Sequence, residues 1–114
     1  MIWQELTDIT QLEQLPGESD KQAIGIFKHS TRCSISATAL DRLERNWSKA
    51  PGTEALKMYY LDLIAHRDIS NAIAEKFGVP HESPQFILLK NGRVVYHESH
   101  YGIQLEDILK QAAL

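Results

Sequence analysis

Apolar residues follow two alternating patterns in the middle of this chain. Stretches of strand length that are mostly apolar, and rich in aromatic and branched residues, cover residues 22–28, 56–64 and 85–89. Such runs, bounded by turn residues, are typical of strands buried on both faces. Between them, at 34–48 and 67–77, apolar residues recur every three to five positions, which predicts amphipathic helices. The middle of the chain therefore alternates between strand and helix.

The last third of the sequence predicts a hairpin followed by a helix. Asn91 and Gly92 form a pair that is typical of a two-residue hairpin turn. This turn joins the strand at 85–89 to a second strand expected at 93–97. After a break, apolar residues at helical spacing predict an amphipathic helix over 105–112.

The segment before the first central strand predicts only short elements. Residues 2–6 are expected to form a short edge strand, and residues 10–15 one or two helical turns. Asp8 or Thr10 would cap those turns. Residues 16–20 are rich in turn formers and are expected to be a loop.

This order of elements predicts an α/β fold. A strand, a helix and a second strand form a parallel pair with a right-handed crossover, and the hairpin adds an antiparallel pair. We expect one domain over residues 1–114, with a mixed central sheet of four or five strands flanked by helices.

Composition and charge narrow the possible functions. The chain has 114 residues, of which 43% are hydrophobic and 24% charged, and a formal net charge of -3. That charge gives no electrostatic reason to expect nucleic acid or a membrane surface as a partner. No apolar run approaches the roughly 18 residues that a membrane helix needs, and no signal peptide is visible at the N-terminus. A single cysteine excludes an intramolecular disulfide, so a cytoplasmic location is expected.

That single cysteine, Cys33, is the most informative position for chemistry. It falls between the strand at 22–28 and the helix at 34–48, and is therefore expected at a helix N-terminus. Free N–H groups and the positive end of the helix dipole stabilise a thiolate there, and Arg32 adds a positive charge. A lone cysteine is often only a small buried hydrophobe, but polar neighbours on both sides favour a reactive thiol.

Several polar residues near this position or later in the chain admit more than one role. Ser36, in the first helical turn, either caps backbone N–H groups or holds the thiolate of Cys33. His29 could act as an acid or base, but at a strand end we expect a partly exposed polar residue. His97 and His100 lack further ligands at a spacing that zinc sites use, so no metal site is expected.

The element order, with a cysteine after the first central strand, resembles the thioredoxin fold over nearly the whole chain. Residues 86–95 are similar to the thioredoxin hairpin, and Ser83-Pro84 falls where that fold carries a cis-proline. Residues 28–37, with the sequence K-H-S-T-R-C-S-I-S-A, are similar to the active-site segment of monothiol bacilliredoxins. These are small proteins of the bacillithiol redox system.

The chain departs from these families at informative positions. Ser36 stands where thioredoxin has the second cysteine of its C-x-x-C motif. Phe27 replaces a buried acid that accepts a proton when thioredoxin resolves a disulfide. Arg32 replaces a tryptophan of thioredoxin, and Ser34 stands where bacilliredoxins often have proline. The resemblance therefore implies chemistry with one thiol rather than ordinary dithiol reduction.

The resemblance implies a monothiol thiol–disulfide oxidoreductase. It would remove a low-molecular-weight thiol, expected to be bacillithiol, from protein mixed disulfides. Cys33 would be the nucleophile, with Arg32 and Ser36 supporting it. Four further residues would bind the substrate: Thr31, Ser34, Ser83 and Pro84. No tightly bound cofactor is expected, and the partners would be S-thiolated client proteins and the small thiol itself as co-substrate.

Two other functions remain open from the sequence alone. A single cysteine and a small thiol can bridge an iron–sulfur cluster between two subunits, as in monothiol glutaredoxins. The C-G-F-S motif of those proteins differs from this chain at Ser34 and Ile35. The other alternative is a binding module that keeps the fold but has an unreactive cysteine.

Overall fold

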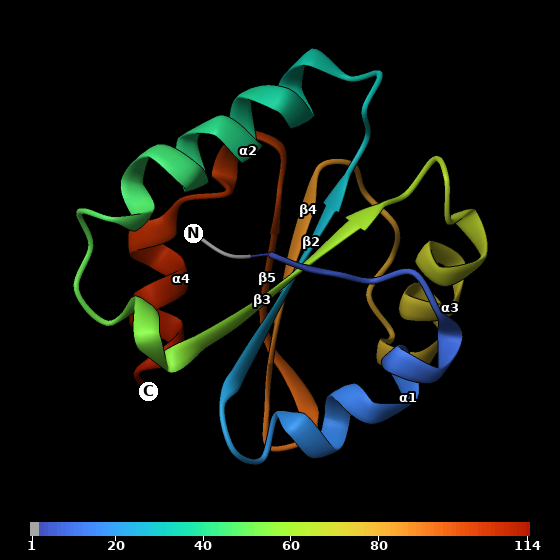
Figure 1. The fold of residues 1–114 in the computed structure, drawn as a ribbon, viewed down its shortest axis with the longest axis horizontal. Helices are drawn as coiled ribbons and strands as arrows, with labels where there is room; N and C mark the ends of the chain where they lie inside the picture. The colour runs from blue at the N-terminus through green and yellow to red at the C-terminus, as the bar shows by residue number, and fades with distance from the viewer. Residues whose placement is uncertain (1–2) are drawn as a thin grey trace.

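The computed structural model describes residues 3–114, and its elements follow the predicted order (Figure 1). The strands and helices are β1 (Gln4–Glu5), α1 (Ile9–Glu18), β2 (Ala23–His29), α2 (Ser34–Trp47), β3 (Leu56–Asp62), α3 (Arg67–Phe77), β4 (Gln85–Lys90), β5 (Arg93–Ser99) and α4 (Leu105–Ala112). Two short 3-10 helices are η1 (Thr53–Ala55) and η2 (His100–Gly102). The predicted central strands, hairpin and amphipathic helices are confirmed, and their ends differ by at most two residues.

The strands form one mixed sheet, which confirms the predicted α/β class. The strand order is β1-β3-β2-β4-β5. Strands β1, β3 and β2 are parallel, whereas β4 is antiparallel to both β2 and β5. The predicted edge strand at residues 2–6 is confirmed for Gln4 and Glu5, and Ile2 lies outside the described residues. Lys28 of β2 pairs with Gln85 of β4, so the end of β2 and the start of β4 share one edge of the sheet.

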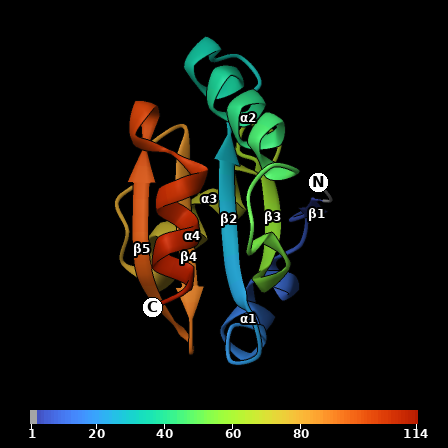
Figure 2. The same cartoon turned by 90° about the vertical axis from the view of Figure 1, so that its left-hand side faces the viewer.

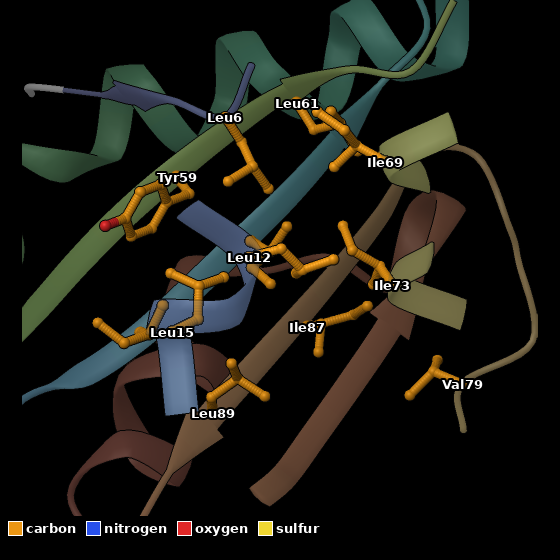
Figure 3. Close-up of a cluster of buried hydrophobic side chains, with 12 residues drawn as sticks. Leu6, Leu12, Leu15, Tyr59, Leu61, Ile69, Ile73, Val79, Ile87 and Leu89 are labelled. Atoms are coloured by element: carbon orange, nitrogen blue, oxygen red, sulfur yellow. The ribbon is translucent and has the colours of Figure 1, made fainter. Parts of the chain in front are cut away.

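Helices cover both faces of this sheet. In Figure 2, α2 and α4 lie in front of the sheet, and α1 and α3 cover the far side. Side chains of β2 contribute alternately to the hydrophobic clusters on the two faces of the sheet, because successive side chains of a strand point to opposite faces. Ile24 and Ile26 pack with residues of α1 and α3, in the cluster that Figure 3 shows. Ala23 and Phe27 pack with residues of α2 and α4. No helix within residues 3–114 has the length and apolar character to cross a membrane.

The loop predicted at residues 16–20 is wrong for residues 16–18, because α1 continues past Pro16 to Glu18. Ser19 and Asp20 form a turn after the helix. A proline inside a helix removes one hydrogen bond and crowds the carbonyl four residues earlier, but Pro16 lies in the last turn of α1. Leu15 is completely buried and holds the turn against the core. The Ser19 hydroxyl donates to the Pro16 carbonyl at 2.6 Å, which closes the helix end. At the other end, the predicted cap at Asp8 is confirmed, in a capping box with Gln11.

Candidate functional site

Cys33 lies where β2 passes into α2, as the sequence predicts. It is the N-cap residue of α2, with an extended backbone at φ -113° and ψ 120°. Its carbonyl accepts a helical hydrogen bond from the N–H of Ala37 at 3.0 Å. The side chain is partly exposed and makes no capping hydrogen bond. The thiol is therefore reachable from solvent at the positive end of the helix dipole.

The loop that carries Cys33 is tied to α2 by Ser36. The N–H of Cys33 donates to the carbonyl of Ser30 at 3.1 Å, which closes a β-turn over Thr31 and Arg32. The N–H of Ser30 in turn donates to the Ser36 hydroxyl at 3.0 Å, and Ser36 is completely buried. Capping of α2 is one of the two roles that the sequence leaves open for Ser36, and the structure corrects it: the hydroxyl accepts from a backbone N–H of the loop instead of from an N–H of α2.

Three predicted site residues surround Cys33 at the surface. Thr31, Arg32 and Ser34 are all exposed. Arg32 takes part in none of the ion pairs that residues 3–114 form. Its positive charge, one residue before the thiol, is therefore not neutralised by a fixed carboxylate of the described chain.

His29 is buried, which corrects the expectation of a partly exposed residue. It is only 6% exposed, because its ring lies between the rings of Phe27 and Tyr60, with centroids 5.9 and 5.6 Å away. Its Nδ1 atom lies 2.7 Å from the Ser36 hydroxyl oxygen. Burial lowers the pKa of His29, against the opposing effect of nearby carboxylates. The ring is therefore mostly neutral at pH 7 and serves as a hydrogen-bond partner of Ser36.

The Ser83-Pro84 peptide bond is cis, as predicted. It directly precedes β4, and the pairing of Gln85 with Lys28 places it at the sheet edge where the Cys33 loop begins. Pro84 is buried. The Ser83 hydroxyl is also buried, and no hydrogen-bond partner reaches it among residues 3–114.

Sequence reasoning missed a polar cluster beside the same edge. Lys28 is completely buried, and its Nζ atom lies 3.3 Å from both the Ser70 carbonyl oxygen and Nδ1 of His81. Burial lowers the pKa of Lys28 to about 8. The sequence carries one signal of this cluster, a charged residue at the end of an apolar strand. Such a residue is equally typical of a strand that ends in solvent.

Two other features lie apart from Cys33. Within residues 3–114 there is no group of three or more His, Cys, Asp and Glu side chains that could hold a metal ion. His100 lies in η2, with its Nε2 atom 3.5 Å from the carboxylate of Glu82. A groove of about 570 Å³ lies between α4 and the C-terminal end of α2, at the opposite end of that helix from the thiol.

The fold, with a cysteine at the N-terminus of α2, defines a thioredoxin-fold protein. A solved structure described as a candidate oxidoreductase with a thioredoxin fold is 33% identical, with a TM-score of 0.79, covering 94% of this chain and 90% of that chain. The thioredoxins of Malassezia sympodialis and Fasciola hepatica are each 18% identical, with TM-scores of 0.76 and 0.72. They cover 99% and 96% of this chain, and 92% and 98% of their own. At that identity they show the fold alone.

The family model of the monothiol bacilliredoxin BrxC matches residues 4–108. The chain therefore belongs to the monothiol bacilliredoxin family, which confirms the resemblance seen at residues 28–37. Membership of this family, together with the oxidoreductase neighbour, supports a redox enzyme that acts through thiol chemistry.

Proposed function

We propose that this protein is a monothiol thiol–disulfide oxidoreductase that removes bacillithiol from S-thiolated client proteins in the cytoplasm. One observation supports this most strongly. The only cysteine is the partly exposed N-cap residue of α2, and Ser36 stands three residues later, where a dithiol enzyme has its second thiol. A protein with this site can form a mixed disulfide but cannot resolve it internally.

The first step is an exchange on the client's mixed disulfide. The thiolate of Cys33 attacks the bacillithiol sulfur, a bond forms between these two sulfurs, and the client–bacillithiol bond breaks. The electron pair of the broken bond leaves with the client sulfur, which takes a proton from solvent. Bacillithiol is now attached to Cys33, and no outside reductant has been used.

The second step requires another thiol. A free bacillithiol thiolate attacks the bacillithiol sulfur attached to Cys33, which releases the Cys33 thiolate and the symmetrical bacillithiol disulfide. The client is thereby reduced, and one further bacillithiol molecule is oxidised. Transfer to Cys33 therefore needs no added thiol, but turnover does.

The surrounding residues have separate roles in this proposal. The unpaired charge of Arg32 and the dipole of α2 stabilise the Cys33 thiolate. Ser36 holds the turn that presents the thiol, through its hydrogen bond from Ser30. The exposed side chains of Thr31 and Ser34 contact the small thiol.

The segment at Ser83 and Pro84 would bind the client. In thioredoxin-like proteins, the backbone before this proline pairs with an extended client segment as an added strand. Here that backbone lies at the start of β4, beside the end of β2, where the Cys33 loop begins. A client strand laid along it would bring its mixed disulfide toward the thiol.

The proposal is tested by mixing reduced protein with a purified client that carries bacillithiol, and following both masses. We expect one bacillithiol to move to Cys33 for each client without added thiol, and many clients to be reduced once free bacillithiol is supplied. Cys33→Ser should abolish both steps. If the client keeps its adduct while Cys33 remains free to react with iodoacetamide, the chain acts as a binding module instead.

A further inference from the structure

Lys28 is a buried cation to which the thiol chemistry assigns no task. It occupies a strand position whose neighbours in the same layer, Ile24 and Ile26, are aliphatic. It takes part in none of the ion pairs within residues 3–114. Burying a charge costs free energy unless the charge is paired and hydrogen-bonded. The groups that Lys28 contacts therefore indicate its role.

Those groups belong to two other segments of the chain. The Nζ atom of Lys28 donates to the carbonyl of Ser70 in α3 and contacts Nδ1 of His81, in the loop between α3 and β4. A lysine ammonium only donates hydrogen bonds. Nδ1 of His81 must therefore be the acceptor, and the ring proton must be on Nε2. This contact therefore connects two segments: β2, which precedes Cys33, and the loop that precedes Pro84.

This loop has further contacts along its length. Nδ1 of His81 also lies 3.4 Å from the Ser70 hydroxyl oxygen, and the Glu82 carboxylate lies 3.5 Å from Nε2 of His100. The side-chain amide of Gln85 donates to the Pro80 carbonyl at 3.0 Å, and the N–H of His100 donates to the Pro84 carbonyl at 3.0 Å. Figure 1 shows the loop passing beside the end of β2. The contact from Lys28 joins the middle of residues 80–83 directly to β2, the strand that precedes the Cys33 loop.

We propose that Lys28 is a positioning residue, which holds the loop 80–83 against β2 so that the backbone before Pro84 can pair with a client beside Cys33. This inference rests on the proposed function, because it concerns how clients bind. Lys28 does not touch the reacting sulfurs. Its removal should therefore weaken client binding and leave the intrinsic reactivity of Cys33 unchanged.

The test compares four variants in single-turnover transfer from a bacillithiol-carrying client. Lys28→Met and His81→Ala each remove one side of the contact, and the double variant removes both. Lys57→Met is the matched control. Lys57 is also a lysine on this face of the sheet, but it pairs with Ile24, at the opposite end of the strands. A parallel reaction with dithiodipyridine, a small disulfide that needs no client surface, reports the reactivity of Cys33 alone.

We expect Lys28→Met and His81→Ala each to raise the client concentration for half-maximal rate about tenfold, the size of one charged hydrogen bond. The effect of the double variant should be smaller than the sum of the two single effects, because both single variants remove the contact between Lys28 and His81. Each also removes a separate contact with Ser70. Rates with dithiodipyridine should not change, and Lys57→Met should behave like the wild type.

The inference is overturned if the effects of the two single variants add, if dithiodipyridine rates fall in parallel, or if neither variant affects client binding. His81 is exposed, so His81→Ala tests the contact even if Lys28→Met folds poorly. Failure of the wild type itself to take bacillithiol from the client would instead refute the proposed function.

Discussion

Replacing Lys28 by methionine should stabilise the protein at neutral pH, although it should impair client binding. The ammonium group is completely buried and has lost its hydration without gaining a carboxylate partner. Burial lowers the pKa of Lys28 from 10.5 to about 8. Methionine has a similar length and carries no charge, so it removes this unfavourable term and keeps most of the packing.

The magnitude follows from the two pKa values. A change from 10.5 to about 8, at 1.36 kcal/mol per pKa unit, corresponds to about 3 kcal/mol of lost stability at pH 7. Methionine also gives up the contacts with Ser70 and His81, which together contribute about 1–2 kcal/mol. The net gain for Lys28→Met at pH 7 should therefore be about 1–2 kcal/mol.

This gain should disappear as the pH rises. Between pH 8 and 10.5, the folded wild type has lost the Lys28 proton whereas the unfolded chain keeps it. The free energy of unfolding of the wild type therefore rises with pH in this window. The variant has no such group, so the difference between the two should shift by about 3 kcal/mol in favour of the wild type.

Urea unfolding, followed by the fluorescence of Trp3 and Trp47 at several pH values from 7 to 10.5, measures this difference. Lys57→Met is a control for which the change in the free energy of unfolding at pH 7 should have the opposite sign. The pKa of Lys57 is raised, first by its hydrogen bond with Tyr59 and then by that with Glu18, so its removal should lower stability at pH 7. A difference in the free energy of unfolding between wild type and Lys28→Met that does not vary with pH would contradict the lowered pKa of Lys28.

Three further predictions concern the Cys33 loop. Ser36→Ala should lower the free energy of unfolding by about 1–3 kcal/mol in urea titrations, because it leaves the N–H of Ser30 without its partner. Ser36→Cys should create a resolving thiol, and the variant should reduce insulin disulfides in a turbidity assay where the wild type stalls as a mixed disulfide. Because burial lowers the pKa of His29 below 6.5, wild-type stability should fall as the pH drops below 6.5. His29→Asn should show a smaller fall between pH 7 and 5 in thermal unfolding.

Most of the fold could be predicted from the sequence because its signals are local. The strands β2 and β4 are buried on both faces, and most of each strand, residues 23–27 and 86–89, is therefore an apolar run. The hairpin turn at Asn91 and Gly92 has its signal in two adjacent residues. Pro16 misled the prediction, because the hydrogen bond from Ser19 that closes α1 around it leaves no pattern in the sequence.

The candidate site was predictable only in part. A strand-to-helix junction is a local feature, so the position of Cys33 at the helix N-terminus followed from the pattern. The burial of His29 depends on Tyr60, and the burial of Lys28 on Ser70 and His81, which are 31 to 53 residues further along the chain. Strand periodicity cannot reveal such contacts. Polar residues at a strand end are as typical of an end exposed to solvent as of one buried in the core.

The most direct test of thiol transfer through Cys33 is the mass of the protein isolated from its native host after oxidative stress. If Cys33 carries the small thiol between client and regenerating thiol, the isolated protein should contain one bacillithiol disulfide at Cys33, which is released by a reductant. If Cys33 is unmodified and freely alkylated while client proteins in the same cells carry bacillithiol, the monothiol transfer mechanism is contradicted.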